Sequence, residues 1–250
     1  MAADDETIVG IHPVSEALTA GEPVRAIVIA KHRESDPAIK TITDAARRGG
    51  VTVRIEPESW FHKFGSARHQ HVAAVLPEFS YADWAETRRR LAERNDALVV
   101  AADHIEDPQN LGAIMRSAEA AGASALIIPE RRNAGVTAAT RRAAAGAASH
   151  LAVARVPNLV RALEDLKEAG YWVTGLATEA GAVPYTSVDY LGKCALVVGG
   201  EGKGLSRLAS ERCDHLVKIP MRGKVASLNV AAACAVVLYE VVRQRAAAGL

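Results

Sequence analysis

Gly199-Gly200-Glu201-Gly202-Lys203-Gly204-Leu205-Ser206 is the stretch that decides the fold of this chain. It follows residues 194–198, a continuously apolar run typical of a strand buried on both faces of a parallel sheet. Glycines at four of the eight positions would be costly inside a helix or strand. They suit a backbone that turns sharply and leaves its N–H and C=O groups free for a ligand. The stretch therefore predicts a ligand-binding turn at the end of a buried strand.

Two phosphate-binding loops can be compared with this turn. In a P-loop the lysine precedes Ser or Thr, whereas Lys203 precedes Gly204. The glycine spacing also differs from the G-x-G-x-x-G pattern of dinucleotide-binding turns. Nucleotide binding of either kind is not indicated, and a purely structural turn stays open as an explanation of this loop alone.

A second block lies downstream, where Ile219-Pro220-Met221 is predicted to end another short apolar strand. Ser227 is a good helix N-cap and is predicted to open a long apolar helix that runs to about residue 243. Asn229 would then occupy the second or third helical position, where asparagine has low helix propensity. A ligand contact explains such a residue better than packing does.

A third block lies upstream, where residues 97–102 are predicted to form a strand and residues 107–112 a turn into the next helix. Arg116 lies on that helix among small and apolar neighbours, which favours an anionic or carbonyl partner over a solvated arginine. Asn110 precedes it by six residues, a spacing that does not share one helix face. The two side chains are expected to converge only if Asn110 lies on the turn before the helix.

Together these blocks resemble the three motifs of the SpoU (TrmH) family of RNA ribose 2′-O-methyltransferases, a branch of the SPOUT superfamily. The similarity covers residues 97 to about 245. It implies an α/β SPOUT fold in which the end of the chain forms a deep trefoil knot and binds S-adenosylmethionine. Knots are nearly absent from proteins, so the resemblance alone predicts this one.

The resemblance also implies roles for individual residues. Those predicted to line the cofactor pocket are Gly199, Gly200, Gly204, Ile219 and Leu228, with Thr178 after a predicted strand over residues 172–177. Those predicted to act in catalysis or RNA positioning are Asn110, Arg116, Glu201, Ser227 and Asn229. A guanidinium is a poor proton acceptor, so Arg116 is expected to clamp a phosphate and stabilise the developing alkoxide. Glu201 either contacts the reacting groups or orients Asn110, and no metal ligand is predicted.

Residues 1–77 are predicted to form a separate small α/β domain that resembles the L30e-like substrate-binding domain of many SpoU enzymes. The predicted strands cover 24–30, 51–55 and 72–76, and the predicted helices cover 13–20, 37–48 and 59–64. His71 stands where that family usually has glycine. With His69 it would fall on one face of a strand, where metal binding is possible but a structural or RNA-contacting role is favoured. Residues 78–96 are expected to be a linker ending in a short helix, before a catalytic domain over 97–250.

Composition is that of a globular protein with sizeable cores: 250 residues, 49% hydrophobic and 24% charged. No apolar run has membrane-spanning length, and the acidic N-terminus is unlike a signal peptide, which predicts a cytoplasmic protein without a membrane partner. The three cysteines lack C-x-x-C spacing and are expected to be buried free thiols. A net charge of only +1 means that RNA binding must depend on a local basic patch. The candidates are Arg131, Arg132, Arg141, Arg142, Lys203, Arg207, Arg222 and Lys224.

Over its whole length the chain is most similar to the subgroup that methylates a guanosine ribose of 23S rRNA. Alternatives are another rRNA nucleotide, as in thiostrepton-resistance-type enzymes, a tRNA nucleotide, a base methyltransferase, or a non-catalytic RNA-binding assembly factor. Relatives commonly carry glutamate at the position of Ser149, so substrate choice depends on what that glutamate does. The resemblance implies a homodimer that buries the apolar helix over residues 228–243, with RNA and not DNA as the partner.

Overall fold

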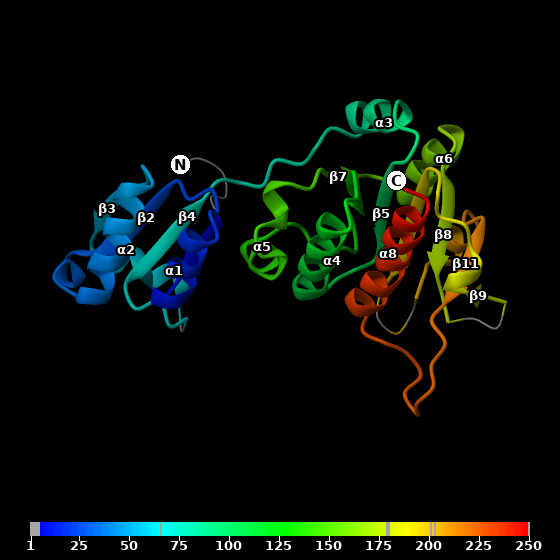
Figure 1. Cartoon of the computed structure of the whole chain (residues 1–250). Helices are drawn as coiled ribbons and strands as arrows, with labels where there is room; N and C mark the ends of the chain where they lie inside the picture. The colour runs from blue at the N-terminus through cyan, green and yellow to red at the C-terminus, as the bar shows by residue number, and fades with distance from the viewer. Residues whose placement is uncertain (1–5, 66, 179–180, 201, 203, 250) are drawn as a thin grey trace. The chain divides into compact units, whose positions relative to one another are not determined.

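The structure is a computed structural model that describes residues 6–65, 67–178, 181–200, 202 and 204–249. The chain divides into two compact units, Met1–Ser80 and Tyr81–Leu250, which are described separately below (Figure 1).

The N-terminal unit is built on a four-stranded sheet with the order β1-β4-β2-β3. Its strands are β1 (Glu6–Val9), β2 (Ala26–Ala30), β3 (Thr52–Glu56) and β4 (Val72–Leu76). Strands β2 and β3 are parallel, and β4 runs antiparallel to both β1 and β2. The sequence does not predict strand β1, because it is only four residues long and only Ile8 is fully buried. The strand is defined by its pairing with β4 and not by a hydrophobic pattern in the sequence.

Helices α1 (Ile11–Thr19) and α2 (Pro37–Arg48) pack against each other and against this sheet. Helix α2 begins as predicted because the Asp36 carboxylate caps it, accepting hydrogen bonds from the N–H groups of Ala38 and Ile39. The 3₁₀ helix η2 (Glu58–Phe64) adds the buried ring of Phe61 to the core that contains Val28 and Val75. The N-terminal unit thus has a hydrophobic core of its own.

The C-terminal unit is built on a seven-stranded sheet with the order β7-β6-β5-β10-β8-β11-β9, and all its strands are parallel. The strands are β5 (Leu98–Asp103), β6 (Ala125–Pro129), β7 (Val153–Val156), β8 (Trp172–Leu176), β9 (Val183–Pro184), β10 (Cys194–Gly199) and β11 (His215–Lys218). All six residues of β5 are buried, as expected for a strand covered on both faces. The predicted strands over 97–102, 172–177 and 194–198 are therefore confirmed to within one residue at each end.

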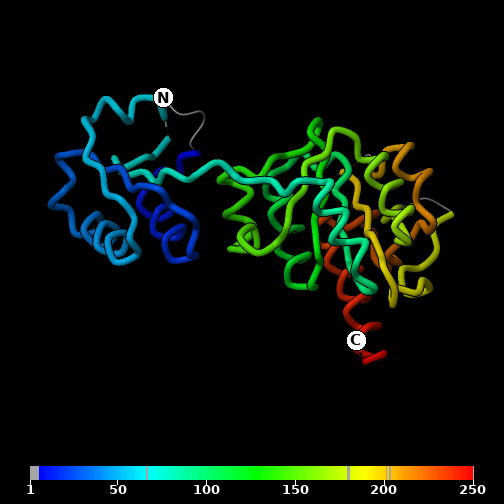
Figure 2. The backbone as a smooth tube through the Cα atoms, turned by 90° about the horizontal axis from the view of Figure 1, so that it is seen from above, coloured from blue at the N-terminus to red at the C-terminus, as the bar shows by residue number. Residues whose placement is uncertain are grey.

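Six α-helices accompany this sheet: α3 (Trp84–Ala92), α4 (Pro108–Ala120), α5 (Ala138–Ala144), α6 (Leu159–Glu168), α7 (Arg207–Ser210) and α8 (Val230–Ala247). Helices α4 and α8 lie side by side, and the backbone trace of Figure 2 shows α8 ending the chain. Helix α4 also packs closely on α5. A Cβ atom on Gly112 would lie 2.4 Å from the carbonyl oxygen of Thr140, so this close approach requires glycine. Among the described residues, no helix is long and apolar enough to cross a membrane.

The segment predicted as a linker, residues 78–96, is largely held on the C-terminal unit. The indole N–H of Trp84 donates to Oδ2 of Asp165 in α6 at 3.1 Å, and Arg88 forms an ion pair with the same carboxylate at 3.3 Å. The Tyr81 hydroxyl accepts a hydrogen bond from the N–H of Val136 at 2.9 Å. From Tyr81 onward the segment is therefore anchored to the C-terminal unit. Its helix α3 is held on α6 by the contacts of Trp84 and Arg88.

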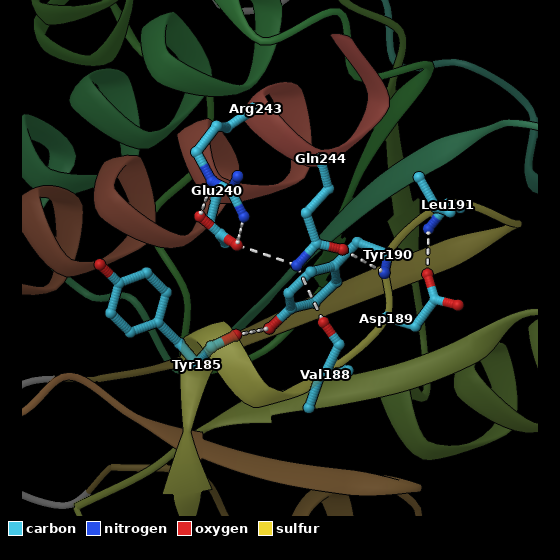
Figure 3. Close-up of polar contacts among 8 residues, drawn as sticks. All are labelled: Tyr185, Val188, Asp189, Tyr190, Leu191, Glu240, Arg243 and Gln244. Carbon is cyan, nitrogen blue, oxygen red and sulfur yellow. Dashed lines mark hydrogen bonds and ion pairs between the residues drawn. The ribbon is translucent and has the colours of Figure 1, made fainter. Parts of the chain in front are cut away.

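The end of α8 holds the loop that follows β9 through a polar network (Figure 3). Gln244 donates to the carbonyl oxygen of Val188 at 3.0 Å and to Oε1 of Glu240 at 2.9 Å, and its own Oε1 accepts from the N–H of Tyr190 at 3.0 Å. Arg243 donates two hydrogen bonds of 2.7 Å to the two carboxylate oxygens of Glu240. These bonds lower the pKa of Glu240 below its ordinary value, and burial opposes them.

This network predicts how stability depends on pH. A carboxyl whose pKa is lowered by folding stabilises the protein above its unfolded pKa, and that contribution is lost as the pH falls through the folded pKa. We expect Glu240→Gln to be less stable than the wild type above the ordinary carboxyl pKa of 4.5, and the difference to shrink at lower pH. Urea unfolding at a series of pH values measures it. The matched control is Glu119→Gln on the exposed side of α4, which should leave the acid slope unchanged; parallel curves for wild type and Glu240→Gln would contradict the expectation.

Candidate functional site

A cavity of about 620 Å³ lies where β8, β10 and β11 end and α8 begins. Its lining residues are Leu176, Ala177, Thr178, Gly199, Gly200, Gly202, Gly204, Lys218, Ile219, Pro220, Met221, Ala226, Ser227, Leu228, Asn229, Val230 and Ala233. The volume falls in the range of roughly 300–1,000 Å³ that is usual for small-molecule and cofactor sites. The carboxyl edge of a parallel sheet is also where ligands of such folds bind. The cavity is therefore a cofactor-sized pocket formed by segments that are far apart in the sequence.

The glycine-rich turn forms one wall of this pocket, and its geometry explains the glycines. A Cβ atom on Gly199 would lie 2.1 Å from the backbone carbon of Gly204, so no side chain fits there. Gly204 donates its N–H to the carbonyl oxygen of Gly200 at 3.0 Å. Gly202 and Gly204 have φ values of +77° and +63°, which disfavour other residues. The turn is structurally constrained and lines the pocket, so its structural role is confirmed and ligand binding by it stays a prediction.

Asp103, the last residue of β5, holds this turn in place and was missed from the sequence. Its backbone oxygen accepts the N–H of Gly200 at 3.0 Å, and its Oδ2 accepts the N–H of Ser206 at 2.6 Å. Its Oδ1 lies 2.6 Å from Nδ1 of His104. The side chain is almost completely buried. One feature of the sequence does point to Asp103. It is a carboxylate at the end of a buried strand, where an ionisable side chain needs hydrogen-bond partners.

Asn229 connects the pocket to α4. It is the N-cap of α8, with its Oδ1 accepting from the N–H groups of Ala231 and Ala232 at 3.0 and 3.3 Å. Its Nδ2 donates to Oδ1 of Asn110 at 2.8 Å. The prediction that Ser227 caps this helix was wrong, because the chain enters α8 two residues later. The same side chain therefore caps one helix and binds another.

Asn110 and Arg116 point in different directions from α4. Asp107 caps this helix and Pro108 is its first residue, so Asn110 lies in the first turn and not on the preceding turn as expected. Asn110 is buried, whereas Arg116 is exposed, and neither lines the pocket. Within the described part of the chain, no ion pair or side-chain hydrogen bond involves the Arg116 guanidinium. The partner predicted for Arg116 is therefore not among those residues.

Eight of the predicted site residues line the pocket together: Thr178, Gly199, Gly200, Gly204, Ile219, Ser227, Leu228 and Asn229. Ile219 follows β11, which ends at Lys218, and does not belong to the strand as predicted. Glu201 and Lys203 lie outside the described residues.

The basic patch predicted from the sequence loses one member. Arg141 is buried on α5 and not on the surface, because α5 packs closely against α4. The exposed members are Arg131, Arg132, Arg142, Arg207, Arg222 and Lys224.

The cysteines and histidines give no sign of redox or metal chemistry. All three thiols are free; Cys194 and Cys234 are buried as predicted and Cys213 is half-buried. Burial raises the pKa of Cys194 to about 11 and those of Cys213 and Cys234 to about 12, so the thiols are protonated at neutral pH. His69 and His71 precede β4 in a loop, and not on a strand face as expected. In the described part of the chain, no three His, Cys, Asp or Glu side chains are placed to hold a metal ion.

Comparison with known proteins places this geometry in a family. The SpoU rRNA methylase family matches residues 97–239, and the RNA 2′-O-ribose methyltransferase substrate-binding family matches residues 7–82. The chain is 39% identical over 97% of both lengths to a Staphylococcus aureus (strain COL) protein assigned to the TrmH family of tRNA/rRNA methyltransferases. It is 43% identical to the 23S rRNA (guanosine-2′-O-)-methyltransferase RlmB of Xanthomonas campestris pv. campestris, over 98% of this chain and 99% of that protein.

A solved structure supports the same assignment. The SpoU methyltransferase AviRb of Streptomyces viridochromogenes, in complex with the cofactor AdoMet, superposes with a TM-score of 0.67 at 28% identity. The superposition covers 96% of this chain and 90% of AviRb. The chain belongs to the SpoU (TrmH) family and has the SPOUT fold. It is an RNA 2′-O-ribose methyltransferase whose cofactor is S-adenosylmethionine. The pocket at the sheet edge has a volume in the range usual for a cofactor site.

The double role of Asn229 can be tested by separating capping from cofactor binding. Asn229→Ala removes the cap and the bond to Asn110, so we expect it to lower the free energy of unfolding by about 1–2 kcal/mol and to weaken S-adenosylmethionine binding. Asn229→Asp keeps a capping oxygen and should lose less stability. Urea unfolding and calorimetric titration with S-adenosylmethionine measure the two effects.

Asn158→Ala is the matched control, because Asn158 caps α6 away from the pocket through the N–H of Arg161. It should lower stability by a similar amount without changing cofactor affinity. If Asn229→Ala also left that affinity unchanged, Asn229 would be a helix cap only.

Proposed function

We propose that this enzyme methylates the ribose 2′-hydroxyl of a guanosine in 23S rRNA, in the cytoplasm. The observation that carries the proposal is the 43% identity to the Xanthomonas RlmB protein, which extends through both units of the chain. A tRNA nucleotide is the second candidate, because the similar Staphylococcus protein belongs to a family of tRNA/rRNA methyltransferases. The deep trefoil knot implied by the resemblance to SPOUT proteins is part of the same proposal.

The pocket residues position the two reactants of an in-line displacement. S-adenosylmethionine supplies an electrophilic methyl group on a sulfonium. Backbone groups of Gly199, Gly200 and Ile219, with the side chains of Thr178 and Leu228, are proposed to bind and orient it. Ser227 is exposed at the pocket wall and is proposed to hold the ribose. Correct alignment of oxygen, carbon and sulfur accounts for much of the rate in such reactions.

The polar residues behind this wall are proposed to act on the substrate. The Asn229 amide is fixed by its bonds to α8 and to Asn110, so it presents a preorganised dipole to the pocket. Gly204 completes the turn, and Glu201 is proposed to act next to Asn110. A guanidinium is a poor proton acceptor, so Arg116 is proposed to bind the phosphate beside the target ribose.

Labelled S-adenosylmethionine tests the reaction directly. With unmodified 23S rRNA, the wild-type protein should transfer label to a nucleotide that resists alkaline hydrolysis, because a 2′-O-methyl group blocks attack on the adjacent phosphate. Arg116→Ala should lower the rate by about 10²–10³-fold, as expected for loss of one group that stabilises transition-state charge. Arg161→Ala, an exposed arginine on α6 outside the site, is the control and should retain activity. Label in an alkali-sensitive nucleotide would instead indicate a base methyltransferase, and no transfer to any RNA would indicate a binding protein.

We also propose a homodimer in which Arg116 completes the partner's active site. Arg116 is exposed on α4 and away from its own pocket, and the neighbouring helix α8 exposes Val236 and Tyr239 to solvent. Exposed apolar side chains on a packed helix are typical of a subunit interface.

Mixed dimers test the shared site. As homodimers, Arg116→Ala should have the strongly reduced rate given above, and Leu228→Trp, which fills the pocket, should be inactive. In a heterodimer of the two variants, the intact pocket of one subunit receives the intact arginine of the other, so one active site of the two should be restored. Activity is measured after co-expression with two affinity tags. Complete inactivity of the heterodimer would show that each subunit uses its own Arg116.

A further inference from the structure

The N-terminal unit carries a histidine cluster at one end of its sheet. His32 lies in the 3₁₀ helix η1 (Lys31–Arg33), directly after β2, and His69 and His71 lie directly before β4. The ring centroids of His32 and His71 are 4.8 Å apart, and those of His69 and His71 are 4.6 Å apart. The N–H of His71 donates to Nδ1 of His69 at 3.1 Å. We call these three residues the histidine cluster.

The backbone at His71 is one that glycine adopts more easily. His71 has a φ of +55°, and Gln70 before it has a φ of +48°. Hydrogen bonds fix this conformation: the His71 carbonyl oxygen accepts from Ala30 N–H at 3.0 Å, and Oε1 of Gln70 accepts from Ile11 N–H at 3.0 Å. The substrate-binding domains that this unit resembles usually have glycine here. An imidazole at a backbone-strained position is a sign of function rather than of packing.

Charged and titratable groups from three segments face His71. They are His32 and Arg33 of η1, Glu58 of η2 and His69 of its own loop, and the ring of Phe61 packs against it edge-on. Burial lowers the pKa of His71, and the charges on His69, His32 and Arg33 lower it further. Glu58, whose Oε1 is 3.2 Å from Nε2 of His71, acts in the opposite direction and raises the pKa of His71. In the free protein these contacts therefore favour the neutral form of His71.

The permanent charges of this unit give it no net positive charge. Residues 1–80 contain nine Lys and Arg against eleven Asp and Glu, a formal charge of −2 with neutral histidines. The same residues contain five of the eight histidines of the chain. Phosphate neutralisation by cationic side chains supplies most of the affinity of proteins for nucleic acids. Protonation of histidines would therefore raise the positive charge that this unit offers to RNA.

We propose that the histidine cluster is a binding site for a phosphate group of the RNA substrate, and that its imidazoles take up protons from solvent when RNA binds. This inference rests on the proposed function, because it takes RNA as the substrate. A protonated imidazole donates a charge-assisted hydrogen bond to a phosphate oxygen, which a neutral one cannot match. A bound phosphate favours the protonated form, so affinity is highest at low pH and falls as the pH rises through the pKa of the complex.

The test measures the affinity of the full-length protein for an unmodified 23S rRNA transcript at fixed ionic strength, with EDTA present. We expect binding about tenfold tighter at about pH 6 than at about pH 8. His71→Gly suits the observed backbone and should reduce this ratio to about threefold or less. His32→Gln is exposed and should reduce it as well, which protects the test against misfolding of one variant. His215→Gln in the C-terminal unit is the control and should keep the wild-type ratio.

Calorimetry provides a second readout. Binding heats in two buffers of different ionisation enthalpy should show net proton uptake by the wild type and less uptake by His71→Gly. A ratio for His71→Gly equal to that of the wild type, or pH-independent binding by the wild type, would overturn the histidine site. Binding that is seen only when EDTA is left out would show a metal site instead. Failure of the wild type to methylate RNA at any pH contradicts the proposed function, whereas unchanged pH dependence in the variants contradicts only this site.

Discussion

The buried carboxylate of Asp103 is the constraint on which the active site depends. Seven parallel strands bring their carboxyl ends to one edge, and the glycine-rich turn at that edge is held by contacts from the neighbouring strand β5. Asp103 binds both ends of the turn, at the N–H groups of Gly200 and Ser206. The backbone carbonyl oxygen of Asp103 accepts from Gly200, and its buried carboxylate accepts from Ser206, so a different turn geometry would leave a buried acceptor unpaired at a cost in free energy. The pocket wall is thereby preorganised before any cofactor binds.

A second link ties the pocket to the packed helices α4 and α8. Asn229 begins α8 and donates to Asn110 in the first turn of α4, while Glu240 and Gln244 anchor the other end of α8 to the loop around Tyr190. Helix α8 is therefore held at both ends, by polar contacts, against segments that are far away in the sequence. A shift of α8 would move Asn229, which lines the pocket, so the position of this helix and the shape of the pocket are coupled.

Several features could be predicted because they depend on short stretches of chain. The apolar runs of β5, β8 and β10 define buried parallel strands, and Asp36 before Pro37 defines the start of α2. The helix start near Ser227 was misplaced because Asn229, two residues later, is an equally good cap. An arginine in a sequence predicts a surface position, so Arg141 is expected in the basic patch. Its burial follows only from the close packing of α4 on α5.

The family, the order of the motifs and eight of the residues that line the pocket follow from the sequence, since motif spacing and glycine content are local properties. Which of these residues meet depends on the tertiary structure. It placed Asp103 under the glycine-rich turn, joined Asn110 to Asn229 across 119 positions of the chain, and turned Arg116 away from both. Such contacts depend on how parallel strands and helices pack in space, and a hydrogen bond between distant residues leaves no periodic signal in the chain.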